Sequence, residues 1–264
     1  MSRRFREHNL RRVTELNGIW DFAFLGDRDP ESVDAASIEF NDRMAVPGCF
    51  DATPAHAGKR GLVAYRTCVL LPDDTPHRLI LDGVHHWCRV FVAGKRLRDH
   101  AGGFTRFATD IVGHQVGENT VVVLVDNRFD YDRCPLHLEY FDWYHFGGIT
   151  RPAQLHRLGD AWIDGLRVVT EDISPPTLSV WIDYGAADPP GQTPLTIACD
   201  GRVVLSQTVD LPATCGHIQH TLELDGAALW SPGTPNLHML HVRLGDDDMR
   251  ERIGIRQVRV DGQQ

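Results

Sequence analysis

The feature that most constrains the fold is a succession of short segments in which apolar and polar residues alternate. In residues 16–24, for example, this alternation places Trp20, Phe22 and Phe24 on one face, as in a half-buried strand. Gly, Pro and Asp clusters separate most of these segments, and no stretch of ten or more residues shows helical periodicity. The sequence therefore predicts an all-β protein built from sandwiches, the first of them most simply a jelly roll.

A domain junction is predicted at Gly159-Asp160, after the strand-like run 153–158. About seven further strands follow over roughly 100 residues, a number typical of an immunoglobulin-like sandwich. We therefore expect a jelly-roll β-sandwich over residues 1–158 and an immunoglobulin-like β-sandwich over residues 159–264.

Composition excludes several classes of function. The formal charge of −9 argues against nucleic-acid or anionic-membrane binding, because both require basic patches. No apolar run approaches the ~20 residues of a membrane span, and the charged N-terminal sequence does not resemble a secretory signal. The six cysteines show no close pairing, which favours free thiols, buried at Cys68, Cys88 and Cys199. We expect a cytoplasmic protein.

The candidate binding segment is residues 139–152, in which aromatic residues, an aspartate and two glycines occur together between two strands. Aromatic rings contact the C–H faces of sugars and carboxylates accept bonds from their hydroxyls, so this mixture suits a carbohydrate site. A hydrophobic loop that packs against the domain, with a capping Asp, explains the composition equally well. The predicted substrate-binding residues are Asp142, Trp143, Tyr144 and His145. For Trp143 and Tyr144, packing against the domain is an alternative to contact with a sugar. The side chain of His145 could point either into the domain or toward the substrate.

Two residues after this group are predicted to support the loop. Gly148 lies in a Gly-Gly turn, and Arg151 is expected to pair with Asp126 or Asp142. The whole connection from Asp126 to Gly148 shows no pattern of a helix or strand but is rich in aromatic residues. We therefore expect an ordered loop with a functional role.

Metal and cofactor sites are not predicted. The groups His85-His86-x-Cys88, Cys134-x-x-His137 and Cys215-x-His217-x-x-His220 have no second matched pair at zinc-finger spacing and lie among strand residues. Glu139 is interpreted as a solvated or Arg-paired residue rather than as half of a catalytic pair. No phosphate-binding glycine loop and no nucleophile elbow is present in the sequence.

Several motifs occur in an order that resembles glycoside hydrolase family 2, the β-galactosidase and β-glucuronidase family. The most specific resemblance is Asp142 followed by aromatics and then Gly148-Ile149-Thr150-Arg151, similar to the family's D-x-(aromatic)-x-x-x-G-I-x-R segment. Asp126-Asn127 resembles the end of its G-x-N-x-(L/V)-x-V-x-V-D-N strand. Residues 229–237 resemble W-x-P-x-x-P-x-L, and residues 254–258 resemble G-(F/I)-R-x-(V/I). Ala93 departs from the pattern, which usually has Asn before this turn glycine.

The resemblance implies an N-terminal, galactose-binding-like domain whose Asp, here Asp142, reaches into the active site of a neighbouring barrel. In the family, a (β/α)8 barrel follows and carries the two glutamates of a retaining mechanism. The sequence ends at Gln264 before any barrel strand, so we predict no catalytic residue and no turnover by this chain alone. The expected partners are a β-glycoside and, if the chain is a fragment, a catalytic barrel of the same polypeptide; a homo-oligomer is left open. The alternative is a stand-alone carbohydrate-binding or interaction module with no enzymatic role.

Overall fold

The computed structural model describes residues 5, 7–129, 144–258 and 262. The chain divides into two compact units. One unit is Val13–Arg157, and the other is Leu158–Gln264 together with the N-terminal segment up to Arg12. The change from one unit to the other at Arg157–Leu158 is close to the predicted junction, but residues 7–12 group with the second unit.

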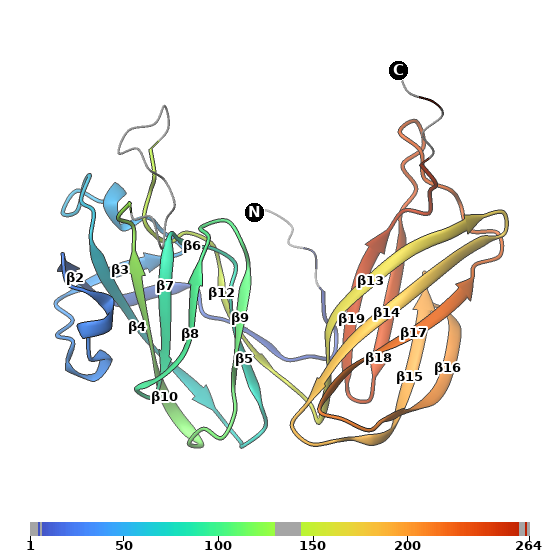
Figure 1. The fold of residues 1–264 in the computed structure, drawn as a ribbon, viewed down its shortest axis with the longest axis horizontal. Helices are drawn as coiled ribbons and strands as arrows, with labels where there is room; N and C mark the ends of the chain where they lie inside the picture. Colours follow the sequence, from blue (N-terminus) through green and yellow to red (C-terminus); the bar gives the residue numbers. More distant parts are fainter. Residues whose placement is uncertain (1–4, 6, 130–143, 259–261, 263–264) are drawn as a thin grey trace. The chain divides into compact units, whose positions relative to one another are not determined.

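In the first unit, the described residues form three antiparallel sheets (Figure 1). The six-stranded sheet has the order β3-β2-β4-β10-β7-β8, the four-stranded sheet has the order β1-β12-β5-β9, and β11 pairs with β6. The strands are β1 (Val13–Glu15), β2 (Gly18–Gly26), β3 (Asp42–Val46), β4 (Leu62–Leu71), β5 (His77–Leu81), β6 (Val84–His85), β7 (Trp87–Val92), β8 (Lys95–Ala101), β9 (Phe107–Ile111), β10 (Gly117–Asp126), β11 (Gly148–Ile149) and β12 (Ala153–Arg157).

The core of the first unit explains the apolar pattern of its strands. Val121, Val123 and Val125 of β10 join a buried cluster that also contains Leu79 and Leu155 from the four-stranded sheet. The intervening β10 residues face a smaller cluster on the other side of the sheet, together with residues near the short 3-10 turns η1 (Pro30–Ser32) and η2 (Ala35–Ser37). Because both faces of β10 are covered, this strand is a continuous apolar run rather than an alternating one.

The described part of the second unit is a sandwich of seven strands in two antiparallel sheets, with the orders β13-β14-β17 and β16-β15-β18-β19. Both sheets contribute buried residues to one core, among them Val180, Ile182, Ile197 and Val242. The strands are β13 (Ala161–Ile173), β14 (Pro176–Ala186), β15 (Gly191–Cys199), β16 (Arg202–Leu211), β17 (Cys215–Glu223), β18 (His238–Leu244) and β19 (Asp247–Ile253).

The N-terminal segment is held to the second unit by a buried ion pair. Arg11 donates from Nε to Asp247 Oδ1 at 2.8 Å and from Nη2 to the carbonyl of Ile163 at 2.7 Å. Both partners of the Arg11–Asp247 pair are almost fully buried. The Asp248 side chain accepts from the backbone N–H groups of residues 9–11, with donor–acceptor distances between 2.7 and 3.2 Å. The bonds to Asp247 and Asp248 cross more than 230 positions of sequence, which explains why local patterns did not predict them.

The prediction of an all-β sandwich protein is confirmed, and the only helical elements in the described residues are short 3-10 turns. The more specific names, jelly roll and immunoglobulin-like, remain predictions.

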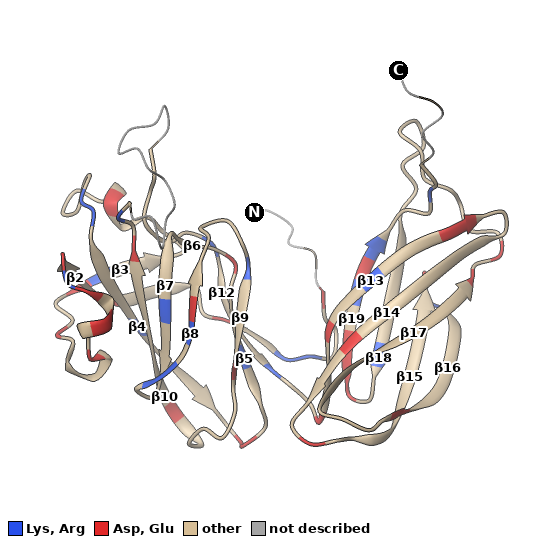
Figure 2. Ribbon diagram, in the orientation of Figure 1, with Lys and Arg blue, Asp and Glu red and all other residues tan. Residues whose placement is uncertain are grey.

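All five cysteines in the described part of the chain are free thiols, but Cys68 is exposed, contrary to expectation, because its side chain points away from the core on β4. Lys and Arg are interspersed with Asp and Glu along the strands (Figure 2). None of the described residues forms a helix long and apolar enough to cross a membrane.

Candidate functional site

The described part of the candidate segment begins with alternating outward and inward side chains. Tyr144 and Phe146 are 44% and 42% exposed, whereas His145 between them is only 3% exposed. The rings of Tyr144 and Phe146 lie 4.5 Å apart between centroids. An exposed pair of neighbouring aromatic rings is a suitable surface for a sugar ring. Asp142, Trp143 and Glu139 lie outside the described residues.

A third exposed aromatic residue, Phe104, belongs to the same neighbourhood. Its ring centroid lies 4.9 Å from that of His85, and His85 donates from Nδ1 to the carbonyl of Phe146. Phe104 is 70% exposed. Phe104 and Phe146, about 40 positions apart in sequence, thus both lie next to His85. In the sequence, Phe104 follows two glycines, and nothing in that run identifies the partners of its ring.

Asp51 holds the candidate segment to the rest of the first unit through buried hydrogen bonds. Its two carboxylate oxygens each accept from the backbone N–H of Gly147 at 3.0 Å, and Oδ2 also accepts from Asn127 Nδ2 at 3.1 Å. Burial raises the pKa of Asp51, and the bonds from Gly147 and Asn127 offset part of this rise. Sequence reasoning missed Asp51, because a single Asp after a Pro-Gly turn gives no signal that distinguishes it from a solvated loop residue.

Glycines are required where the segment passes the core. A Cβ on Gly147 would lie 2.6 Å from Asn127 Cβ and 2.7 Å from Phe50 Cε1. Gly148 has φ +135°, and a Cβ there would lie 2.6 Å from the carbonyl oxygen of Gly48. Both positions therefore exclude any larger residue, for reasons of space and, at Gly148, also of backbone conformation.

Arg60 joins the two described ends of the long connection. It donates from Nη1 to the carbonyls of Asn127 at 3.1 Å and His145 at 3.2 Å. Its guanidinium carbon lies 4.3 Å from the ring centroid of Phe129 and 5.4 Å from that of Tyr144. Arg60 was also missed, because it precedes its strand and its partners are 67 and 85 positions away.

Arg151 lies against Phe104 in the described part of the chain. It donates from Nη1 to the carbonyl of Phe104 at 3.1 Å, and its guanidinium lies over the Phe104 ring. Asp126 instead pairs with Arg128, at 2.6 Å between Arg128 Nη2 and Asp126 Oδ2. Of the two expected partners of Arg151, Asp126 is thus bound by Arg128, which is only two residues away and reaches both carboxylate oxygens. The alternative partner, Asp142, is outside the described residues.

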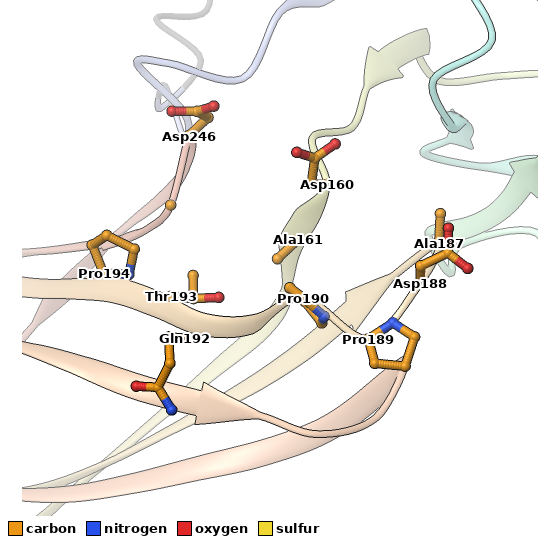
Figure 3. A pocket seen from close by; sticks show the side chains of 11 residues that line it. Asp160, Ala161, Ala187, Asp188, Pro189, Pro190, Gln192, Thr193, Pro194 and Asp246 are labelled. Atoms are coloured by element: carbon orange, nitrogen blue, oxygen red, sulfur yellow. The ribbon is translucent and has the colours of Figure 1, made fainter.

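The second unit contains a separate hollow of about 530 Å³ (Figure 3). Figure 3 shows the carboxylates of Asp160, Asp188 and Asp246 with Pro189 and Pro190 along its wall. No residue predicted to bind substrate lines it. Its carboxylates occur without a neighbouring nucleophile or base among the lining residues, so we assign the hollow no chemistry.

Comparison with known proteins gives a consistent result. No model of a known protein family matches the sequence. A β-glucuronidase of Paenibacillus borealis is 27% identical over 286 aligned residues, which include 96% of this chain and 46% of that protein. The structure of a β-glucuronidase of Bifidobacterium dentium, solved with coumarin-3-O-glucuronide, matches with a TM-score of 0.77 and 26% identity, over 96% of this chain and 49% of that chain.

A GH2 β-galacturonidase of Eisenbergiella tayi has the same fold, with a TM-score of 0.84 over 99% of this chain and 46% of that chain, at 24% identity. This chain thus spans less than half of the length of these three relatives. The matches include both units. The predicted resemblance to the N-terminal region of the family 2 glycoside hydrolases is therefore confirmed over nearly the whole chain.

Proposed function

We propose that this chain forms the non-catalytic, sugar-facing region of a retaining family 2 glycosidase that acts on a β-glycoside. The observation that carries the proposal is the extent of the matches: almost all of this chain aligns with less than half of each relative. In the family, the two catalytic glutamates belong to a (β/α)8 barrel. The described residues form two β-sandwiches, which supply a scaffold and a loop rather than a catalytic carboxylate pair.

The proposed contribution to the active site is the segment around residues 142–146. Asp142 would accept hydrogen bonds from glycone hydroxyls, and the exposed rings of Tyr144 and Phe146 would contact the sugar or the aglycone. The anchor at Asp51, the close-packed glycines and the Arg60 bridge support this role, because a binding loop must be held in position by its own domain. His145 points inward, so we assign it to the interior of the loop rather than to the sugar.

The substrate class follows from the relatives. Two relatives in sequence are named β-glucuronidase and putative β-glucuronidase, and one structural relative was solved with galacturonate. We propose a β-linked uronide as the substrate of the complete enzyme, with a β-galactoside as the second choice because of a β-galactosidase relative that is 29% identical over 62% of this chain. The free thiols of the described cysteines favour a cytoplasmic location.

The test is to assay the purified 264-residue chain with aryl β-glucuronide, β-galacturonide and β-galactoside, and to titrate it with the free sugars. We expect no turnover and weak binding, because half of the pocket belongs to the barrel. Turnover that persists after contaminating enzyme is removed would contradict the proposal. Tight binding of a free sugar would instead favour the alternative function, a stand-alone carbohydrate-binding module.

A further inference from the structure

Three histidines from two separate parts of the sequence converge beside the anchored loop. His85 and His86 lie at the end of β6, and His145 lies three residues before β11, which pairs with β6 through Gly148 opposite His85. Ring centroids are 4.2 Å apart for His85 and His145 and 5.6 Å apart for His86 and His145. One ring nitrogen of each histidine lies within 4.8 Å of those of the other two.

His145 is the most unusual member of this group. Its side chain is buried, and its Nε2 has no hydrogen-bond partner among the described residues. Buried polar atoms without a partner are uncommon and are often explained by an ion or a water. Burial, and then the neighbouring His85, Arg60 and His86, lower the pKa of His145 to about 3. An ion bound at Nε2 would supply the partner that this buried nitrogen lacks.

His85 makes the hydrogen bond that is usual for a metal-binding histidine. Its Nδ1–H donates to the carbonyl of Phe146, which fixes the tautomer and leaves the lone pair on Nε2. Metal-binding histidines usually donate their other ring N–H to a carbonyl or carboxylate in this way. Gly103 allows the ring to sit here, because a Cβ on that residue would lie only 1.7 Å from His85 Cδ2.

We propose that His85, His86 and His145 form a binding site for one divalent transition-metal ion of the Zn²⁺ type. Three imidazole ligands suit zinc, nickel, cobalt or copper and do not suit Mg²⁺ or Ca²⁺, which prefer oxygen ligands. In a tetrahedral site with Zn–N bonds of ~2.05 Å the nitrogens lie about 3.4 Å apart, so ring movements of roughly 1 Å complete the site. The fourth position would be open to a water or another oxygen ligand.

The positive charge of Arg60, close to this group of histidines, is compatible with metal binding there. Arg60 is the cation that faces His85 and His145, but its Nη1 donates to the carbonyls of Asn127 and His145. Its guanidinium also lies against the face of the Phe129 ring, a favourable position for a cation. The two other groups of possible ligands in the described residues are less suitable. Both ring nitrogens of His238 are already bonded, and Asp247 and Asp248 hold the N-terminal segment.

The experiment uses the untagged full-length chain after removal of metal with a chelator. Calorimetric titration with ZnCl₂ should show one equivalent bound, CoCl₂ should produce visible d–d absorption, and MgCl₂ should produce no signal. His145→Gln and His86→Gln should each weaken Zn²⁺ binding at least about 100-fold, because even the loss of a second-shell partner costs 10–100-fold. The matched control is His238→Gln, which changes a histidine in another group of possible ligands and should leave Zn²⁺ binding unchanged.

Nuclear magnetic resonance of the unaltered protein provides a readout that does not depend on the folding of variants. Zn²⁺ should shift the imidazole nitrogen resonances of His85, His86 and His145 and no others. The proposal is overturned if no stoichiometric Zn²⁺ binding occurs, if the His145→Gln and His86→Gln variants fold and bind as well as the original chain, or if the resonances of His238 shift instead.

Discussion

Both carboxylate oxygens of Asp51 accept a hydrogen bond from the backbone N–H of Gly147, each at 3.0 Å. The two residues are 96 positions apart in sequence. This contact connects the turn that follows β3 to the segment that leads into β11. It therefore determines where Tyr144 and Phe146 present their rings.

The first prediction concerns this contact. Asp51→Ala leaves the N–H of Gly147 and the amide of Asn127 without an acceptor, and each buried group left unpaired costs ~1–3 kcal/mol. We expect the first unit to lose about 2–4 kcal/mol and the Gly147 amide to lose its protection in hydrogen exchange. Asp51→Asn should have a smaller effect, because its one carbonyl oxygen can still accept from the Gly147 N–H and from Asn127 Nδ2. Asp27→Ala, which changes a fully exposed side chain, is the control and should stay within about 0.5 kcal/mol. Unchanged protection of Gly147 in Asp51→Ala would refute the anchoring role.

The second prediction concerns the β7–β8 turn. Ala93 has φ +48° and Gly94 has φ +78°, so both turn residues are in the left-handed region that Ala disfavours by roughly 1–2 kcal/mol. Asn is preferred at this position of a two-residue hairpin. Ala93→Asn should therefore stabilise the first unit by about 1 kcal/mol in urea unfolding, and Ala101→Asn at the end of β8 should give no gain. Equal effects of the two substitutions would contradict the conformational explanation.

The third prediction concerns the buried ion pair of the second unit. Removal of one partner of a buried pair leaves the other charge uncompensated, so Arg11→Met should cost roughly 3–5 kcal/mol. Arg66→Met breaks the partly exposed pair with Asp21 and should cost at most about 1 kcal/mol. Denaturant unfolding of both variants distinguishes the two cases. A cost for Arg11→Met no greater than that for Arg66→Met would mean that the N-terminal segment does not stabilise the second unit.

The fourth prediction concerns pH. Burial alone would raise the pKa of Asp248, but hydrogen bonds from the backbone of Leu10, Asn9 and Arg11 and from His241 outweigh it and hold this pKa below its usual value. Since the folded pKa is the lower one, the stabilisation is fully present above the unfolded value of about 3.9 and is lost as pH falls through the folded pKa. The stability difference between the original chain and Asp248→Asn should therefore be constant from pH 5 to 7 and shrink below about pH 4. A difference that does not change with acidification would exclude this linkage.

The fold was largely predictable because alternation along strands such as β2 is a local property of the sequence. The site was predictable only where its residues are contiguous, as in the segment that contains Tyr144 and Gly148. Asp51, Arg60 and His85 act through partners more than 60 positions away, and no spacing rule connects them. The attachment of residues 7–12 to the second unit was missed for the same reason, since Arg11 and Asp247 are 236 positions apart.

The central claim is tested most directly by a chimera in which this chain replaces the matching 46% of the Paenibacillus borealis β-glucuronidase. We predict that the chimera hydrolyses aryl β-glucuronide, whereas the same enzyme without the replaced region does not. Asp142→Asn in the chimera should reduce turnover about 10–100-fold, as expected for the loss of a hydrogen bond to a charged group. A folded chimera without turnover, or one in which Asp142→Asn has no effect, would contradict the account.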